Sequence, residues 1–499
     1  MAVPKTLGIE TEYGIVLRGT DDPNPISASS LLINAYLSKR DPRVQPRVSW
    51  DFEDESPSRD ARGATPIAAM PPEIETHLVN AVLTNGSRYY VDHAHPEYSS
   101  PECADAYSVL VHDRAGELIL IESMAAADEI LPPGQEIVVY KNNSDGKGNS
   151  YGTHENYLMD RSTPFGDIVH HGTAHLVTRQ IFTGAGKVGT ELPGMNRDEV
   201  DFQITQRADF FEEEVGLETT LKRPIINTRD EPHADARKYR RLHVIAGDAN
   251  MAEVSTYLKV GTTAIVLGMV EAGAISRLWT FADPVRAMQQ VSLDLTLRQP
   301  LTLEDGTRVT ALEIQEALAA DARRYIDTHG TEFVGGPVAL DVLDRWERTL
   351  AALRRDPMEL ADQLDWVAKY KLMQAYRDRD DMAWNDPRLA AMDIQYHDMR
   401  PGRSLARKLG LQTIADSAHV EAAVTEPPED TRAFFRGECL RKWGDQIVAA
   451  NWDSLVFDVG IDPLRRIPMM EPTRGTRAHV GTVLEESDTP LELLERLRS

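Results

Sequence analysis

The chain has 499 residues, more than a single hydrophobic core usually supports, so we expect a large domain and at least one smaller domain. Its formal net charge of −25 argues against general nucleic-acid binding, which needs a basic surface, and no apolar run is long enough to span a membrane. The two cysteines form no CxxC pattern and the acidic N-terminal segment does not resemble a signal peptide, so we expect a soluble, cytoplasmic protein.

The first predicted element is a strand at residues 5–18, where side chains of opposite character alternate. This period places Glu10 and Glu12 on the same face of the strand. Two carboxylates on one face repel each other unless a cation or a basic group compensates them. Mg²⁺ prefers oxygen ligands, so Glu10 with Glu97 or Glu102 forms a candidate metal set. The alternative is the solvated outer face of an antiparallel sheet.

A helical pattern at residues 27–39 precedes a segment, residues 41–78, that follows neither the helical nor the strand period. This segment contains six prolines and eight acidic residues. It therefore has too little apolar surface to offset the entropy lost on ordering. We expect a mobile lid near the active site and not a structural element, with a neutral surface excursion as the alternative.

The strand pattern returns at residues 87–93, where Tyr90 and Asp92 share one face. The surrounding sequence, RYYVDHAHPEYSSPE, contains two prolines that are each followed directly by a glutamate. Such fixed turns orient carboxylates in the way that ligands require. His93 and His95 are of a kind that is more often structural, so no catalytic role is assigned to them.

The remaining chain is predicted to be α+β. Further strands are expected at 117–121, 136–142, 224–228 and 241–246, and helices at 166–182, 251–272, 311–328, 338–355 and 359–377. A linker-like stretch at 421–432, EAAVTEPPEDTR, precedes a nearly neutral C-terminal segment, whereas the chain before it carries almost all of the negative charge. We therefore expect one domain at residues 1–425 and a small one at residues 430–499.

Polar clusters in the middle of the chain are typical of phosphate binding. They lie at Thr153–Asn156, Gln206–Arg207, Asn227–Asp230 and Arg240–His243. Arginine is suited to this task because its planar guanidinium contacts phosphate oxygens in pairs. Neither GxxxxGK[ST] nor GxGxxG follows a predicted strand, so a bound nucleotide is expected to lie on a sheet.

Several long motifs resemble the family of Pup ligases and Pup deamidases/depupylases, relatives of glutamine synthetase and glutamate–cysteine ligase. The motifs are GIETEYGI, YYVDHAHPEYSSPE, HENYL, TQRADFF, INTRDEPHADARKYRRLHVIAGDANMAEVSTYLKVG and DWVAKY, and they span essentially the whole chain. The resemblance implies a large domain in which a curved antiparallel sheet, packed by helices, cradles ATP and Mg²⁺. A small C-terminal domain is implied to follow it.

The resemblance also implies roles for individual residues. Asp92 matches the catalytic aspartate, as a nucleophile or as a base for water. Glu10, Tyr90 and Glu97 match the Mg²⁺ positions, although a tyrosine is an unusual ligand and can act through its carbonyl or by packing. The positions that match ATP contacts are Arg88, Ser100 and Trp452, and the expected phosphate-side groups are His154, Arg207, Arg229 and His243.

Within this family, the segment 41–78 resembles the extended loop of the deamidase branch. This resemblance implies an ATP-dependent amidohydrolase that converts the C-terminal glutamine of Pup to glutamate and cleaves the isopeptide bond between Pup and a substrate lysine. Pup and pupylated proteins would be its partners, and we expect a monomer. The alternatives are a Pup–protein ligase that consumes ATP and a non-catalytic scaffold that only binds Pup.

Overall fold

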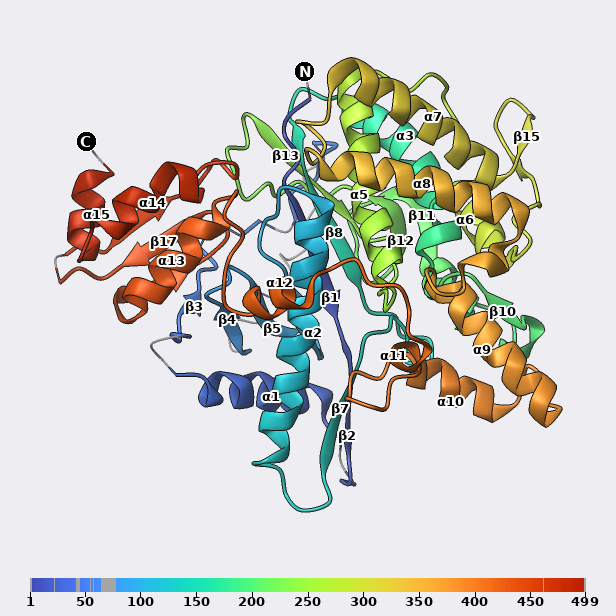
Figure 1. Cartoon of the computed structure of the whole chain (residues 1–499), viewed down its shortest axis with the longest axis horizontal. Coiled ribbons are helices and arrows are strands. Elements are labelled where there is room, and N and C mark those ends of the chain that lie inside the picture. The colour runs from blue at the N-terminus through green and yellow to red at the C-terminus, as the bar shows by residue number, and fades with distance from the viewer. Residues whose placement is uncertain are drawn as a thin grey trace.

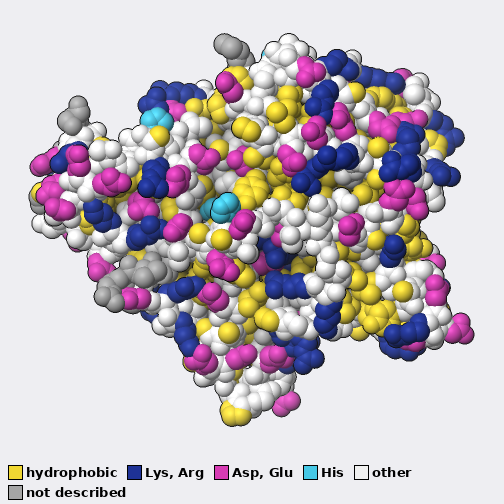
Figure 2. Space-filling view, in the orientation of Figure 1, with side chains coloured by type: hydrophobic (Ala, Val, Ile, Leu, Met, Phe, Trp, Pro, Cys, Tyr) yellow, Lys and Arg dark blue, Asp and Glu magenta, His cyan; other side chains and the backbone are white. Residues whose placement is uncertain are grey.

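The computed structural model shows a mixed helix and sheet protein (Figure 1). It describes residues 2–21, 23–41, 45–53, 55–56, 58–63, 78–460 and 462–497. Within these ranges, no helix is both long and apolar enough to cross a bilayer. Figure 2 shows acidic and basic side chains interspersed over one face of the molecule, so the negative net charge is not concentrated in one patch there.

The largest sheet has six strands in the order β13-β8-β1-β6-β5-β4, and every neighbouring pair is antiparallel. The strands are β1 (Leu7–Glu12), β4 (Asn80–Val82), β5 (Arg88–Asp92), β6 (His95–Ser99), β8 (Thr153–Asp160) and β13 (Tyr239–Val244). The register places Glu12 opposite Glu97, and Glu97 opposite Tyr90. The strand expected at residues 87–93 is thereby confirmed, with Tyr90 and Asp92 on one face.

The single strand expected at residues 5–18 is two strands in the structure. Its first part, β1, alternates as predicted. Ile9 and Thr11 are buried, whereas Glu10 and Glu12 are partly exposed. The strand ends before Tyr13, whose side chain is fully buried and whose N–H donates to the carbonyl of Pro96. The chain continues as β2 (Gly14–Arg18), which pairs with β7 (Glu136–Tyr140) in a separate sheet.

Helices pack against the apolar side of the six-stranded sheet. The layer is built from α2 (Ala106–Asp128), α3 (Phe165–Thr178), α5 (Glu253–Ala272), α7 (Ala311–His329) and α8 (Val338–Arg355), most of which gather at the upper right of Figure 1. Leu7 and Ile9 of β1 belong to the same hydrophobic core as these helices. The opposite face of the sheet is thus left to the polar side chains.

The predicted helices are confirmed to within a few residues at most ends, and one strand prediction is wrong. The helix expected at 27–39 is α1 (Pro25–Lys39), and that expected at 359–377 is a 3₁₀ turn (Pro357–Leu360) followed by α9 (Asp365–Asp380). Residues 117–121 form no strand but lie inside α2. A short apolar run fits a buried helix as well as a strand, and this one continues a helix capped by the Asp105 side chain.

Smaller elements connect these layers. The further strands are β9 (Lys187–Val188), β10 (Phe202–Gln203), β11 (Phe211–Gly216), β12 (Arg223–Asn227), β14 (Leu301–Thr302) and β15 (Arg308–Val309). The further helices before the C-terminal segment are α4 (Gln180–Thr183), α6 (Pro284–Leu293), α10 (Pro387–Tyr396), α11 (Leu405–Leu409) and α12 (Ser417–Ala422).

The C-terminal segment has its own hydrophobic core and a four-stranded sheet, seen at the left of Figure 1. Its elements are α13 (Ala433–Trp443), β16 (Ile447–Ala450), β17 (Ser454–Phe457), β18 (Arg465–Pro468), α14 (Arg477–Glu485) and α15 (Pro490–Arg496). The fourth strand is β3 (Ser49–Trp50), which pairs in parallel with β16. The division into domains at 1–425 and 430–499 stays a prediction, and this sheet draws one strand from the first half of the chain.

The strand β3 corrects one expectation. Residues 41–78 were expected to contain no structural element, but Val48 and Trp50 are buried in the C-terminal core. The alternation around Val48 and Trp50 is too short to stand out from the prolines beside it. Residues 64–77, the middle of the expected lid, lie outside the described residues, so the lid itself stays a prediction.

A buried ion pair fixes β8 to the helical layer. Both side-chain oxygens of Glu155 accept from Arg179, at 2.6 and 2.8 Å, and at most 1% of either side chain is exposed. Arg179 also donates to Thr263 on α5. Because strand side chains alternate, Glu155 holds the strand from behind while His154 and Asn156 project from the other face.

Replacing Arg179 by methionine is expected to lower the free energy of unfolding by about 3–5 kcal/mol, because it leaves a buried carboxylate without its cation. Urea denaturation of the purified variant measures the loss. The matched control is Arg323→Ala, which removes a partly exposed pair with Glu347 and should cost about 0–1 kcal/mol. Equal losses in the two variants would contradict the role of the Glu155 pair.

Candidate functional site

Glu10 lies at the centre of a group of polar side chains on the open face of the sheet. Its Oε1 accepts from the Asn156 amide at 2.7 Å. Its Oε2 lies 3.5 Å from Nδ1 of His154 and 3.9 Å from Nε2 of His243. Arg241 completes the group, with Nη1 at 4.0 Å from Oε1. The strands β1, β8 and β13 therefore bring together residues that are more than two hundred positions apart.

The electrostatics of this group favour an ionised glutamate beside a neutral histidine. Burial raises the pKa of Glu10, but the hydrogen bond from His154 and the charge of Arg241 outweigh it and hold that pKa well below its ordinary value. Burial, together with the neighbouring Arg241, lowers the pKa of His243 far below its ordinary value. Both ring nitrogens of His243 are buried and have no hydrogen-bond partner among the described residues.

A second group of carboxylates lies one step further along β1. Oxygens of Glu12, Asp92 and Glu97 all lie within 4.8 Å of one another. Glu12 accepts from the Gly152 N–H at 2.9 Å, and Glu97 accepts from the Tyr90 hydroxyl at 2.5 Å. The alternation of the first strand places Glu12 on this face, but sequence analysis assigned it no role. Only the register of three strands shows that it belongs to the site.

The pKa values of two carboxylates in this group, Glu97 and Asp92, are shifted in opposite directions. Burial raises the pKa of Glu97 well above its ordinary value, and the nearby charges of Asp92, Glu12 and Glu10 raise it further. Burial also raises the pKa of Asp92, but the hydrogen bond and charge of His93 outweigh it, so that pKa is lowered. His93 Nδ1 lies 2.9 Å from Asp92 Oδ2, and 36% of the Asp92 side chain is exposed. Asp92 thus combines a lowered pKa with an accessible side chain.

Glu102 is not part of either group, so the expectation of a metal set formed by Glu10 and Glu102 is wrong. Its carboxylate accepts from Arg432 at 2.7 Å and forms an ion pair with Arg436. Both arginines are buried and come from the C-terminal segment. They are four positions apart, which places both on one face at the start of α13, and this spacing is the signal that the sequence offered.

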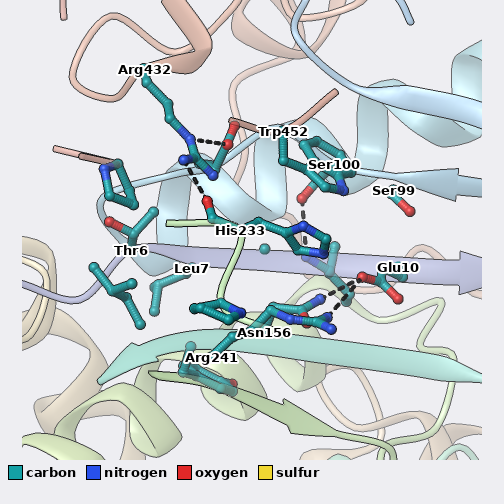
Figure 3. Close-up of a pocket in the computed structure, with 17 residues that line it drawn as sticks. Thr6, Leu7, Glu10, Ser99, Ser100, Asn156, His233, Arg241, Arg432 and Trp452 are labelled. Atoms are coloured by element: carbon teal, nitrogen blue, oxygen red, sulfur yellow. Dashed lines mark hydrogen bonds and ion pairs between the residues drawn. The ribbon is translucent and has the colours of Figure 1, made fainter. Parts of the chain in front are cut away.

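A pocket opens beside Glu10 and runs along β1 toward Thr6 (Figure 3). Ser100 and Trp452 line it, as expected for nucleotide contacts. The Ser100 hydroxyl accepts from the Ile9 N–H at 3.0 Å. Trp452 packs edge to face on Trp50, with ring centroids 5.3 Å apart. Trp452 thus gives the pocket an aromatic wall, and Glu10 with Arg241 lines its charged end.

Other expected residues surround the pocket in different ways. The Arg88 guanidinium lies between the rings of Trp50 and Tyr90, at 4.0 and 3.9 Å from their centroids. The buried Nε of Arg229 has no hydrogen-bond partner in the part of the chain that the structure describes. Arg207 does not line the pocket but bonds Ser150, near Glu12.

Asn156 and Arg241 line the pocket and belong to the polar clusters that the sequence predicted for phosphate binding, although neither was given an individual role. His233 also lines it and lies outside those clusters. His233 has a φ of 46°, which a non-glycine residue rarely adopts, and its carbonyl accepts from Arg432 at 2.6 Å. Figure 3 shows its ring between Ser100 and Asn156. A strained backbone next to a pocket is typical of a functional position.

Comparisons with known proteins identify the family. The family model described as Pup-ligase protein matches residues 5–456. The chain belongs to this family. It is 51% identical to the depupylase of Acidothermus cellulolyticus and 47% identical to the Pup deamidase/depupylase of Mycolicibacterium smegmatis, covering 99% of both chains in each case.

Two solved structures of the Pup ligase PafA have the same fold. The complex of PafA with the prokaryotic ubiquitin-like protein Pup superposes with a TM-score of 0.80 and 32% identity, covering 99% of this chain and 94% of that one. PafA in complex with ADP gives a TM-score of 0.74 and 36% identity, covering 81% of this chain and 89% of that one. The resemblance seen in the motifs is thus confirmed for the family and for the mixed fold.

In this member of the Pup-ligase family, Glu97→Gln is expected to stabilise the metal-free protein at neutral pH by at least about 1 kcal/mol. The folded pKa of Glu97 is raised, so the folded state keeps a proton that the unfolded state releases above about pH 4. The stability that this proton contributes is full below that pH and is lost as the pH rises toward the folded pKa.

Urea denaturation in the presence of a chelator, between about pH 4 and pH 8, measures this dependence. The variant should show a flatter decline than the wild type, whereas the exposed control Glu332→Gln should follow the wild type. Parallel curves for Glu97→Gln and the wild type would contradict the crowding of carboxylates.

Proposed function

We propose that this chain is an ATP- and Mg²⁺-dependent amidohydrolase that deamidates the C-terminal glutamine of Pup and cleaves Pup–lysine isopeptide bonds. The observation that carries the proposal is full-length similarity, at 51% and 47% identity, to proteins named depupylase and Pup deamidase/depupylase. The two ligase structures match at 32% and 36%. The ligase activity is therefore the second candidate.

The donor sets on the sheet fit two cations. Glu10, His154 and His243 would hold one, because His243 offers buried nitrogens without a protein partner. Glu12 and Glu97 would hold the other, with the Tyr90 hydroxyl orienting Glu97 and not acting as a ligand itself. When bound, Mg²⁺ would offset the repulsion among the carboxylates and polarise the carbonyl of the substrate.

The pocket beside Glu10 fits a nucleotide, and the related PafA has been solved with ADP. An adenine ring would lie at the apolar end beside Trp452 and Ser100, with Arg88 behind Trp50 shaping that end. The phosphates would extend toward Glu10, where Arg241 lies within 4.0 Å of that carboxylate. The unsatisfied Nε of Arg229 supports the role on the phosphate side that the family resemblance implies.

Asp92 is the proposed catalytic residue, because it is ionised, accessible and next to the carboxylates that would hold a cation. As a base, it would take a proton from a water that attacks the side-chain carbonyl. As a nucleophile, it would attack that carbonyl, form a mixed anhydride and expel ammonia or the lysine amine, and water would then hydrolyse the anhydride. A single turnover in heavy-oxygen water tests the second route, because label enters Asp92 only when water opens such an anhydride at the Asp92 carbonyl.

The proposed function predicts the product formed from Pup ending in glutamine. With ATP and Mg²⁺, intact-mass measurement should show a gain of about one mass unit, and a Pup–lysine conjugate should release free Pup. Formation of a conjugate from Pup and a lysine substrate would instead favour the ligase. Binding without any mass change would favour a non-catalytic scaffold. Cytoplasmic location and a monomeric state stay predictions.

Asp92→Asn is expected to bind ATP with wild-type affinity but to lose about a thousandfold in turnover. The amide keeps the size of the side chain and removes the charge that activates water or attacks the carbonyl. Calorimetry measures ATP binding, and the mass assay measures turnover. The control Asp235→Asn alters a surface carboxylate that pairs with Arg237 and should retain activity. Near-normal turnover in Asp92→Asn would remove it from the mechanism.

A further inference from the structure

Two buried arginines, Arg207 and Arg223, meet at Ser150 on the side of Glu12 away from the pocket. Arg207 Nε donates to the Ser150 hydroxyl at 3.3 Å, and Arg223 Nη2 donates to the Ser150 carbonyl at 2.7 Å. Their exposed fractions are 1% and 9%. Glu12 is close by, because it accepts from the N–H of Gly152, two residues after Ser150.

Neither guanidinium has a carboxylate partner within 4.0 Å among the described residues. The other donors of the pair are bound to carbonyls: Arg207 Nη1 to Ile245 and Arg223 Nε to Thr219. One amino group of each arginine, Nη2 of Arg207 and Nη1 of Arg223, has no hydrogen-bond partner in the described ranges. Each arginine therefore keeps one amino group available to a ligand.

The electrostatics of the pair also favour an anionic ligand. Burial and the like charge of Arg223 lower the pKa of Arg207 to about 10. The charges of Glu12 and Asp248 act in the opposite direction on Arg207, and those of Glu12 and Glu212 do so on Arg223, but Asp248 itself accepts from the N–H groups of Ala185 and Gln206. Two guanidinium groups largely removed from water, with no described carboxylate within ion-pair distance, are costly, and a bound carboxylate would lower that cost.

We infer that Arg207 and Arg223 bind the α-carboxylate of the C-terminal residue of Pup, while the side chain of that residue lies at Asp92. This inference rests on the proposed function. Both reactions act on the side-chain carbonyl of a C-terminal residue, so the α-carboxylate is present in both substrates. A glutamine inside a chain lacks this group. The pair would thus select C-terminal residues for both deamidation and isopeptide cleavage.

The sequence suggested phosphate binding for Arg207. The position of Arg207 and Arg223 in the structure favours a different ligand. The pocket contacts β1 from Thr6 to Glu10 and is lined by Arg241. Ser150 and Gly152 precede β8 and lie beside the opposite end of β1, at Glu12. Glu12 therefore lies between the pocket and the two arginines. Pup would approach from the side of the arginines.

The test uses two conjugates in which the C-terminal glutamate of Pup is joined through its side chain to a lysine peptide. One conjugate keeps the free α-carboxylate, and the other carries an α-carboxamide. Peptide release with ATP and Mg²⁺ gives kcat/KM for each. The wild type should be about ten- to hundredfold slower on the carboxamide, the factor typical of a charge-assisted, paired hydrogen bond.

Arg223→Gln should lose a similar factor on the free carboxylate and should no longer distinguish the two conjugates, with the KM for ATP unchanged. The matched control Arg240→Gln also removes a buried arginine without an ion pair, one that bonds Thr163, and it should keep the wild-type preference. Arg223→Lys keeps the charge without the planar fork and should retain part of the preference. Thermal melting and ATP binding verify that each variant is folded.

A wild type that cleaves both conjugates at equal rates would overturn the inference and leave the proposed function intact. An undiminished preference in folded Arg223→Gln, or a raised KM for ATP with the preference unchanged, would also overturn it and assign the arginine to the nucleotide. A wild type that releases no peptide from the free-carboxylate conjugate would refute the proposed function and, with it, the inference.

Discussion

Glu10, Glu12, Asp92 and Glu97 are held on one face of a six-stranded antiparallel sheet, and their mutual repulsion is the constraint on which the arrangement of the site depends. Burial and the neighbouring charges of Asp92, Glu12 and Glu10 together raise the pKa of Glu97. On the other face of the sheet, the apolar side chains of β1 and the buried ion pair of Glu155 with Arg179 stabilise the fold against this repulsion. The core therefore holds in place an acidic surface that a cation would stabilise.

The C-terminal segment contributes to the same site from outside the sheet. Arg432 and Arg436 form ion pairs with Glu102, which follows β6. Their other N–H groups hold residues that line the pocket. Arg432 donates to the carbonyl of His233, and Arg436 donates to the carbonyl of Trp452 at 3.0 Å. A glutamate that resembles a metal ligand in the sequence thus serves to join two parts of the chain. Its negative charge is already compensated by two buried cations.

The strand β1 orders the parts of the site along one line. Its first residues contact the pocket, Glu10 lies among histidines, and Glu12 lies among carboxylates with the two arginines beyond it. Positive and negative groups alternate along this line, so a nucleotide and a peptide terminus would approach the central carboxylates from opposite ends. Such an arrangement would keep two anionic ligands apart.

The sequence by itself determined the family, the mixed fold and the shared face of Tyr90 with Asp92, because strand alternation and long motifs are local properties of the chain. It also placed most helices, since their periodicity extends over many turns. It failed at residues 117–121, where a short apolar run fits either period, and at β3, whose partner lies some four hundred residues away. Tertiary structure alone decided that Glu12 joins Asp92, that Glu102 binds arginines and that Arg207 meets Arg223. These facts depend on strand register and on contacts between distant segments, which no local pattern encodes.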